Sequence, residues 1–306
     1  MTDRAPKNTV ASIHRRLLNV SKKTGRAFND LVIYYAIERF LYRLSQSRYA
    51  DRVVLKGGLM LQVWNTPITR VTRDIDLLGK VSNDPDRIRE AVRAICATAV
   101  DDDGLAFDPG TVMTSRIAED GAYEGVRATF KGRFGKVPLA MQVDFGFSDV
   151  ITPEPAHITY PSVLGHPPAQ LLAYNRETAV AEKFEAMTKL GELNSRMRDF
   201  FDVWVLARSF AFDGQALAEA IRATFAHRGT EVEVEPVCFA ERFTSAPAKV
   251  AQWKGFIKTS RMRNTAMEFA EVVMRVREFL QPVAEAIVGG RQHDRQWQPG
   301  GAWAER

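Results

Sequence analysis

The chain changes its hydrophobic period once, and this change constrains its fold more than any other feature. Between residues 111 and 147 apolar and polar residues alternate, as in half-buried strands. From residue 178 to about residue 287 apolar residues recur at three- and four-residue steps, as in helices. The connection at 148–168 holds five prolines, which cannot continue a helix. The sequence therefore predicts a sheet lobe followed by a helical lobe.

The length of 306 residues also favours two lobes, because single domains usually hold roughly 100 to 200 residues. We expect residues 1–165 to form the sheet lobe with N-terminal helices, and residues 166–288 to form the helical lobe. Residues 289–306 are rich in Gly and Gln and are expected to be a flexible tail. The predicted fold class is α/β of the α+β kind, since strands come first and helices follow.

Shorter patterns place the first elements of the sheet lobe. Residues 9–47 carry apolar residues at helical spacing, and residues 84–98 begin with an Asp-Pro helix start. Two short apolar runs, at 53–55 and 75–78, are typical of buried strands. The first run ends at a glycine pair, which favours a turn there.

The sequence carries no membrane or secretion signal that we can identify. It has no run of about 18 apolar residues, and residues 1–16 are polar and basic, unlike a signal peptide. Cys96 and Cys238 lie far apart and belong to no Cys-x-x-Cys motif, so we expect reduced core cysteines. These features predict a cytoplasmic protein with no membrane association.

Two acids form the motif with the clearest chemical meaning. Asp74 and Asp76 are two residues apart on a predicted strand, so their side chains point to one face and can reach one cation. Mg²⁺ takes oxygen ligands and combines one or two carboxylates with substrate phosphates. An isolated Asp-x-Asp is also common on exposed strand faces, so its surroundings must decide between the two interpretations.

A third acid could complete a two-metal site. Asp144 alternates with the apolar residues Met141, Val143 and Phe145, so it points away from their face of a separate strand. It could therefore meet Asp74 and Asp76 across the sheet. The predicted ligands of Mg²⁺ or Mn²⁺ are thus Asp74, Asp76 and Asp144.

The residues around the acid pair suit a triphosphate. Gly57 and Gly58 follow a predicted strand and open a helix, where free backbone N–H groups can hold a phosphate. Thr72 offers a hydroxyl, and Arg70 and Arg73 add positive charge. An ordinary glycine turn beside a polar loop is the alternative. The predicted nucleotide-binding residues are Lys56, Gly57, Gly58, Thr72 and Arg73.

A lysine and an acid stand out in the helical lobe. Lys183 and Asp199 lie on successive predicted helices joined by a turn at 191–195, so they can face each other across a helical hairpin. Lys183 could then contact a triphosphate. The alternative is a structural ion pair, with a second pair between Arg198 and Asp202 at i and i+4.

The net charge of +5 is modest, but the cations are grouped. Grouped cations suit a polyanion such as RNA, although solvated helix faces would look the same. The first group contains Arg15, Arg16, Lys22, Lys23 and Arg26, and the second contains Lys249, Lys254, Lys258, Arg261 and Arg263.

These motifs together resemble the AbiEii/AbiGii family of nucleotidyltransferase toxins, a branch of the polymerase-β-like nucleotidyltransferases. The resemblance rests on VLKGG at 54–58 and RVTRDIDLL at 70–78. It extends into the helical lobe through EKFEA at 182–186 and RMRDFFD at 196–202. One departure is Leu59, where the superfamily often has a small hydroxyl residue after the glycines.

The resemblance implies a polymerase-β-like sheet lobe and a metal-dependent enzyme that transfers a nucleoside monophosphate from a nucleoside triphosphate to an acceptor. Characterised relatives modify the acceptor end of tRNA and act as toxins opposed by an antitoxin encoded nearby. The predicted partners are therefore RNA, with the tRNA 3′ end as the leading acceptor, and a cognate antitoxin. The implied catalytic residues are Asp74, Asp76, Lys183 and Asp199, with Asp202 as an alternative to Asp199. Asp144, chosen from the strand pattern, is expected to be catalytic as well, by helping to deprotonate the acceptor hydroxyl.

Two other functions are compatible with these residues. The same chemistry could act on a protein side chain or on a small molecule. A module that binds nucleic acid or a protein partner without catalysis belongs to a different class, but such a module has no physical reason to keep three acids, a lysine and a glycine pair.

Overall fold

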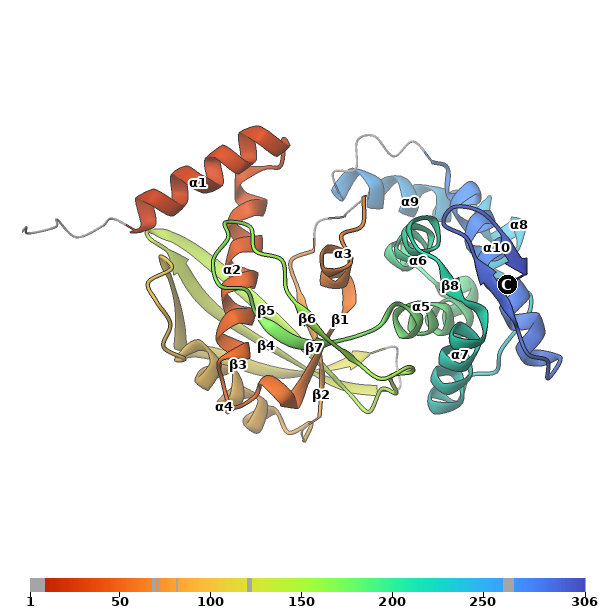
Figure 1. Cartoon of the computed structure of the whole chain (residues 1–306), viewed down its shortest axis with the longest axis horizontal. Coiled ribbons are helices and arrows are strands. Elements are labelled where there is room, and N and C mark those ends of the chain that lie inside the picture. Colours follow the sequence, from red (N-terminus) through yellow and green to blue (C-terminus); the bar gives the residue numbers. More distant parts are fainter. Residues whose placement is uncertain are drawn as a thin grey trace, which may run out of the picture. The chain divides into compact units, whose positions relative to one another are not determined.

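The computed structural model describes residues 9–67, 70, 72–80, 82–119, 123–260 and 267–305. Two compact units account for these residues (Figure 1). The sheet unit lies within Met1–Val63, Thr72–Ser148 and His157–Ala173. The helical unit lies within Trp64–Val71, Asp149–Ala156 and Tyr174–Arg306.

The predicted helical entry is confirmed as two helices. Helix α1 spans Thr9–Thr24 and α2 spans Phe28–Ser45. Gly25 separates them with a φ of +70°, a left-handed conformation that favours glycine and ends a helix. Most side chains of α2 are buried, so this helix forms part of the core.

The predicted strands form one mixed sheet, with the order β3-β4-β5-β2-β1-β7-β6 among the described residues. Strand β2 runs antiparallel to β1 and parallel to β5, whereas β3, β4 and β5 are joined antiparallel. The strands are β1 Val53–Lys56, β2 Ile75–Gly79, β3 Leu105–Glu119, β4 Tyr123–Phe134, β5 Val137–Phe147, β6 Ala156–Thr159 and β7 Gln170–Ala173.

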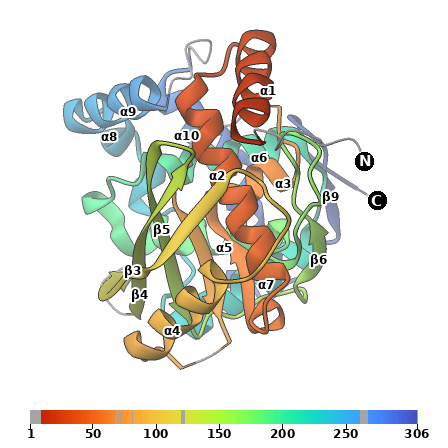
Figure 2. The same ribbon diagram turned by 90° about the vertical axis from the view of Figure 1, so that its left-hand side faces the viewer.

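Helices α2 and α4 (Pro85–Cys96) pack on this sheet (Figure 2). The ring of Phe40 on α2 lies 5.8 Å from that of Phe107 and 5.1 Å from that of Phe130, between centroids. The Asp-Pro start of α4 is confirmed, because Asp84 caps the helix and accepts a hydrogen bond from the Asp86 N–H. Short helical turns complete the unit, namely η1 Ala50–Arg52, η2 Gly57–Leu59 and α3 Met60–Val63.

The helical unit is built mainly from four long helices that pack on one another, α5, α6, α7 and α10 (Figure 1). Its elements are α5 Arg176–Leu190, η3 Gly191–Leu193, α6 Met197–Ser209, β8 Phe212–Asp213, α7 Gly214–Arg228, η4 Val237–Phe239, α8 Glu241–Thr244, α9 Pro247–Thr259 and α10 Phe269–Val288. No helix among the described residues is both long and apolar enough to cross a membrane.

The division of the chain into two units differs from the boundary expected between residues 165 and 166. Strand β7 belongs to the sheet unit because it pairs in parallel with β1, with Ala173 opposite Leu55. Residues 64–71 and 149–156 instead belong to the helical unit. Sheet pairing between distant segments, which local periodicity does not encode, accounts for the difference.

The expected flexible tail is wrong for residues 295–305. Strands β9 (Arg295–Trp297) and β10 (Trp303–Glu305) form a small sheet with β8. The side chain of Trp297 is buried, and its Nε1–H donates to the carbonyl oxygen of Ala207 at 2.6 Å. Two tryptophans in a Gly- and Gln-rich segment thus supply enough apolar surface to hold it against the helices.

Replacing Trp297 with alanine is expected to destabilise the helical unit by about 3–5 kcal/mol, because a buried indole leaves a cavity and an unpaired carbonyl. Gln296→Ala, one residue away and exposed, is the matched control and should cost within about 0.5 kcal/mol. Urea unfolding followed by circular dichroism measures both. Equal effects of the two changes would show that residues 295–305 do not contribute to stability.

Candidate active site

Four charged side chains lie in register across the sheet. Lys56 on β1 is opposite Asp76 on β2, Asp76 is beside Asp144 on β5, and Asp144 is opposite Arg127 on β4. Side chains of directly paired residues point to the same face of a sheet. These four residues, which we call the charged row, therefore carry charges in the order positive, negative, negative, positive.

The structure places Gly57 against the carboxylate of Asp76. Gly57 has a φ of +73°, and a Cβ at this position would collide with the Asp76 side chain. Any other residue at this position would both strain the backbone and displace the carboxylate. Gly57 thus makes room for Asp76, in addition to the predicted role of the glycine pair as a phosphate-holding turn.

The helix expected after the glycines is short, consisting of η2 and the four residues of α3. Gly58 is buried, and the side chain of Leu59 is fully buried. The departure from a hydroxyl residue at position 59 therefore has a packing explanation, since Leu59 belongs to the core.

The segment before β2 is fixed to helix α2. Thr72 is buried, and its N–H donates to the Tyr34 hydroxyl at 3.1 Å. The guanidinium of Arg73 lies 3.4 Å from a carboxylate oxygen of Asp30, while most of its side chain is exposed. Asp74 follows directly and is half-buried one residue before β2 begins. Both anchors hold the backbone that carries Asp74.

Sequence reasoning missed Arg127, the residue that holds Asp144. Nε and Nη2 of Arg127 each donate to one oxygen of Asp144 at 2.8 Å, and Gln142 Nε2 adds a contact at 3.1 Å. The hydrogen bond to Asp144 raises the pKa of Arg127 against the opposing effect of burial, and the charges of Asp74 and Asp76 raise it further. Alternation with buried Val126 and Ala128 places Arg127 outward, but only the β4–β5 register identifies its partner.

The three acids do not assemble into the predicted three-ligand site. Across the described part of the chain, no group of three or more His, Cys, Asp or Glu is positioned to hold a metal ion. Arg127 donates to both oxygens of Asp144, and Gln142 donates to one of them. Asp74 and Asp76 remain half-buried and fit a site that combines two carboxylates with phosphate oxygens.

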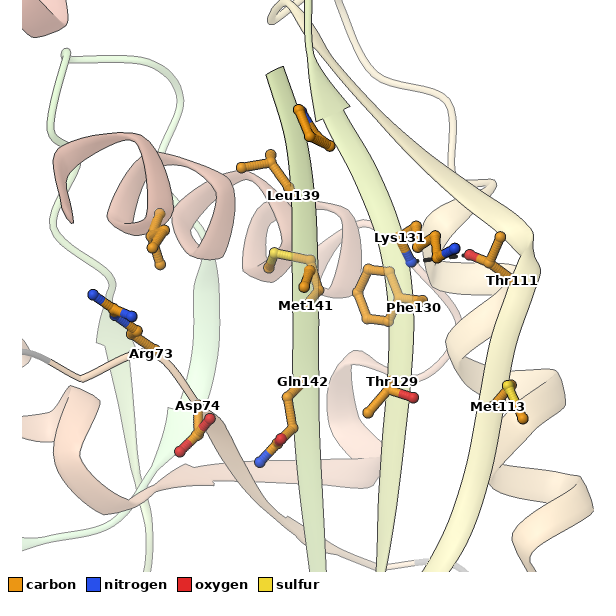
Figure 3. Close-up of a pocket in the computed structure, with 13 residues that line it drawn as sticks. Arg73, Asp74, Thr111, Met113, Thr129, Phe130, Lys131, Leu139, Met141 and Gln142 are labelled. Carbon is orange, nitrogen blue, oxygen red and sulfur yellow. Dashed lines mark hydrogen bonds between the residues drawn. The ribbon is translucent and has the colours of Figure 1, made fainter. Parts of the chain in front are cut away.

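A pocket of about 560 Å³ lies beside Asp74 (Figure 3). It forms where β5 extends beyond β2, because β2 pairs with β5 only from Val143 onward. Arg73 and Asp74 lie on one side of β5, and Lys131 and Thr111 lie on the other (Figure 3). The pocket thus joins exposed apolar lining, from Met113, Pro138 and Ala140, with charged and hydroxyl groups.

The helical unit contains a second charged cluster, which we call the tetrad. Nε and Nη2 of Arg70 donate to the two oxygens of Asp202 at 2.8 and 2.9 Å. Nζ of Lys183 lies 2.8 Å from Asp199 and 2.9 Å from Asp202. All four residues are largely buried, and Asp202 is the most completely enclosed.

Electrostatics keeps the central residues of the tetrad charged. Burial raises the pKa of Asp202, but Arg70 and Lys183 outweigh burial and bring this pKa down to about 2. Burial likewise lowers the pKa of Lys183, but the carboxylates of Asp199 and Asp202 raise it above its usual value. Lys183 and Asp202 are therefore both ionised at neutral pH.

The structure brings Lys183 and Asp199 together, in agreement with the hairpin geometry expected for them. Asp202 also contacts Lys183, so Asp199 and Asp202, the two candidates for the catalytic acid, both lie in the tetrad. The pair between Arg198 and Asp202, part of the alternative interpretation, does not form, because Arg198 is exposed and the partners of the buried Asp202 are Arg70 and Lys183.

The basic groups differ in how accessible their members are. Lys22, Lys23 and Arg26 are exposed at the end of α1 or after it, and Lys254 and Lys258 are exposed on α9. Arg16 is bonded to the carbonyl oxygen of Leu164, and Lys249 donates to that of Asn194 at 2.6 Å. Arg261 and Arg263 lie outside the described residues.

Comparison with known proteins identifies the family. The family model for the nucleotidyl transferase AbiEii toxin of a type IV toxin–antitoxin system matches residues 39–275. No curated protein matches the chain. A Helicobacter pylori crystal structure described as a candidate nucleotidyltransferase is 14% identical, with a TM-score of 0.48 over 87% of this chain and 98% of that chain. JHP933 from Helicobacter pylori is 12% identical, with a TM-score of 0.47 over 94% and 96%. The family match spans most of the sequence, and the chain belongs to the AbiEii family of nucleotidyltransferase toxins.

Proposed function

We propose that this nucleotidyltransferase transfers a nucleoside monophosphate to RNA, with the tRNA 3′ end as the leading acceptor, and that Asp74 and Asp76 hold the Mg²⁺ or Mn²⁺ ion required. The observation that carries the proposal is the position of the Asp76 carboxylate. Its carboxylate fits against Gly57 and lies in the charged row, two residues after Asp74. A carboxylate pair beside a glycine turn is suited to a metal-bound triphosphate.

The reaction forms one bond to phosphorus and breaks another. The acceptor hydroxyl oxygen bonds to the α-phosphorus, and the bond from this phosphorus to the bridging oxygen of pyrophosphate breaks. Pyrophosphate leaves, and the hydroxyl proton passes to water. When bound, a divalent cation supplies positive charge that stabilises the charge developing on phosphate oxygens. Asp144 was expected to accept the hydroxyl proton, but its hydrogen bonds to Arg127 and Gln142 do not support that role.

The pocket beside Asp74 is our candidate for the terminal nucleotide of the acceptor. Its apolar lining can pack against a base, and Lys131, Thr129 and Gln142 can meet phosphate, ribose or base edges. The exposed lysines and Arg26 near α1 supply charge for the rest of a polyanion. A protein or small-molecule acceptor would not use these cations.

In the helical unit, we assign different roles to the two acids of the tetrad. Lys183 has three N–H donors, and two are accounted for by Asp199 and Asp202. We propose that the third donates to a phosphate oxygen of the nucleotide, with Asp199 orienting the ammonium group. Asp202 is then chiefly structural, because it neutralises Arg70 and Lys183 in a buried place.

A type IV toxin–antitoxin family implies an antitoxin that opposes the enzyme. We propose that this antitoxin is encoded nearby. A cytoplasmic site of action is proposed as well, because nucleoside triphosphates and tRNA are present there.

Asp74→Asn and Asp76→Asn are each expected to lower nucleotide incorporation into tRNA by on the order of 100-fold or more, because each removes a charged metal ligand. Folding should persist, since neither side chain is a core residue. Labelled-nucleotide incorporation at saturating Mg²⁺ measures activity, and thermal unfolding measures stability. Asp101→Asn, an exposed acid elsewhere in the sheet unit, is the control. Near wild-type incorporation by either site variant would rule out the metal assignment.

Asp202→Asn is expected to destabilise the helical unit by about 3–5 kcal/mol at pH 7, because it leaves buried Arg70 and Lys183 undercompensated. Asp199→Asn should instead lower turnover with a smaller loss of stability. Because the folded pKa of Asp202 is depressed, its contribution to stability is full above about pH 4 and is lost as pH falls through about 2. Urea unfolding between pH 7 and pH 2 tests both statements. Loss of activity without loss of stability in Asp202→Asn would reverse the two roles.

An RNA acceptor predicts that binding weakens steeply with salt, because each phosphate met by Lys or Arg releases counterions. Reversing three cations near α1 should lower the affinity for tRNA and leave magnesium-dependent nucleotide binding unchanged. Filter binding at several salt concentrations measures the slope. The changes are Lys22→Glu, Lys23→Glu and Arg26→Glu, and the matched control set of exposed cations is Lys80→Glu, Arg87→Glu and Arg93→Glu. Salt-insensitive modification, or equal loss in both sets, would favour a protein or small-molecule acceptor.

A further inference from the structure

The face of β4 that helix α2 does not cover carries two exposed cations. Phe130 points toward α2, where its ring lies 5.1 Å from that of Phe40 between centroids. Side chains alternate along a strand, so Thr129, Lys131 and Arg133 point to the opposite face. All three are exposed. This face of β4 is therefore open to a ligand and positively charged.

The neighbouring side chains on β5 are apolar. Ala140 lies opposite Lys131, and Pro138 lies opposite Arg133. Both are exposed as well. Adjacent strands are about 4.8 Å apart, so each cation stands beside a small apolar surface. We call these four residues, Lys131, Arg133, Ala140 and Pro138, the strip.

The two charges of the strip are not neutralised by the protein. Asp108 lies opposite Lys131 in the β3–β4 register, but its carboxylate accepts a hydrogen bond from the Gly110 N–H at 2.9 Å. Within the described part of the chain, neither Lys131 nor Arg133 forms an ion pair. Both cations can therefore pair with an anionic ligand.

The strip leads from the pocket beside Asp74 toward helix α1. Lys131 lines this pocket together with Asp74 (Figure 3). Beyond Arg133, the turn between β4 and β5 carries Lys136. A second pocket, of about 480 Å³, lies between this turn and α1 and is lined by Arg15 and Lys136 among others. Positive charge thus continues from the pocket beside Asp74 to the basic helix α1.

The spacing within the strip suits a single strand of nucleic acid. Side chains two residues apart on a β-strand are separated by about 6.7 Å. This separation is comparable to that between successive phosphates of an extended strand. An unpaired strand also exposes its bases, which can pack on apolar groups beside the cations. A duplex hides its bases and would leave Ala140 and Pro138 without a contact.

We propose that the strip binds an unpaired 3′ end of RNA, with the terminal nucleotide beside Asp74 and the two preceding phosphates at Lys131 and Arg133. This inference rests on the proposed function, because the acceptor hydroxyl must lie near the metal site. It adds a requirement for the substrate. The distance along β4 from Thr129 to Arg133 is about 13 Å, which corresponds to about three unpaired nucleotides.

The test uses RNA hairpins that share one stem and carry 3′ overhangs of zero to four nucleotides. Labelled-nucleotide incorporation measures activity, and filter binding without nucleoside triphosphate measures affinity. Incorporation by the wild type should rise with overhang length and level off at about three nucleotides. The blunt hairpin should be a substrate at least about tenfold poorer, because its paired end cannot follow the strip.

Lys131→Gln and Arg133→Gln locate the contacts. Each should lower the affinity for the three-nucleotide overhang about three- to tenfold and reduce the slope of log affinity against log salt by about 0.7. With a one-nucleotide overhang, Arg133→Gln should behave as the wild type, because the phosphate that it meets is absent. The matched control is Arg87→Gln/Arg93→Gln, two exposed cations on α4 at the other face of the sheet, which should change nothing. Thermal unfolding shows that each variant is folded.

Each result has a definite meaning. Equal incorporation into blunt and overhanging RNA would overturn this inference and leave the proposed function intact. Loss of affinity by the same factor for every hairpin would show that the strip binds duplex phosphates, and unchanged affinity in both variants would show that it binds no RNA. Either outcome overturns the inference. Labelling of a protein, with no labelling of any RNA, would overturn the proposed function and this inference with it.

Discussion

The parallel pairing of β2 with β5 is the constraint on which the candidate active site depends. It sets Asp76 and Asp144 side by side on strands whose opposite faces are held by the core, so neither carboxylate can move away without disturbing the sheet. The charges at the two ends of the row, Lys56 and Arg127, then offset a repulsion that the topology creates. Gly57 is needed for the same reason, because the place of the Asp76 carboxylate leaves no room for a Cβ. Several features that resemble a nucleotide-binding motif in the sequence are thus also consequences of sheet register.

The tetrad of the helical unit follows the same physical rule in a more buried setting. Asp202 is almost completely enclosed, and an enclosed carboxylate is tolerated only with charged, hydrogen-bonded partners. It has two, and one of them, Arg70, lies 132 residues away in sequence. This distance explains why a helix-based reading paired Asp202 with Arg198, which is local but exposed.

Hydrophobic period was sufficient to predict the strands at 53–55 and 75–78, the helix at 84–98 and the order of sheet before helices, because each depends on residues close in sequence. The proximity of Lys183 and Asp199 was predictable for the same reason, since they lie on consecutive helices joined by a short turn. Arg127 was not predictable, because its role depends on which strand pairs with β5 and in which register. The packing of residues 295–305 was not predicted, because a Gly- and Gln-rich composition suggested a flexible tail. Two tryptophans in this segment donate hydrogen bonds to carbonyl oxygens of the helices. The unit boundaries differ from the expected ones because β7 pairs with β1, a strand that is distant in sequence.

The unequal lengths of β2 and β5 separate the charged row from the pocket in the sheet unit. The charged row lies where the two strands are paired, whereas the pocket lies where β5 continues beyond β2. Asp74 belongs to both regions, since it precedes β2 and also lines the pocket. Substitutions at exposed pocket positions such as Met113, Thr129 or Lys131 leave every contact of the row in place. Under the proposed function, acceptor preference can therefore change through the pocket without disturbing the carboxylates.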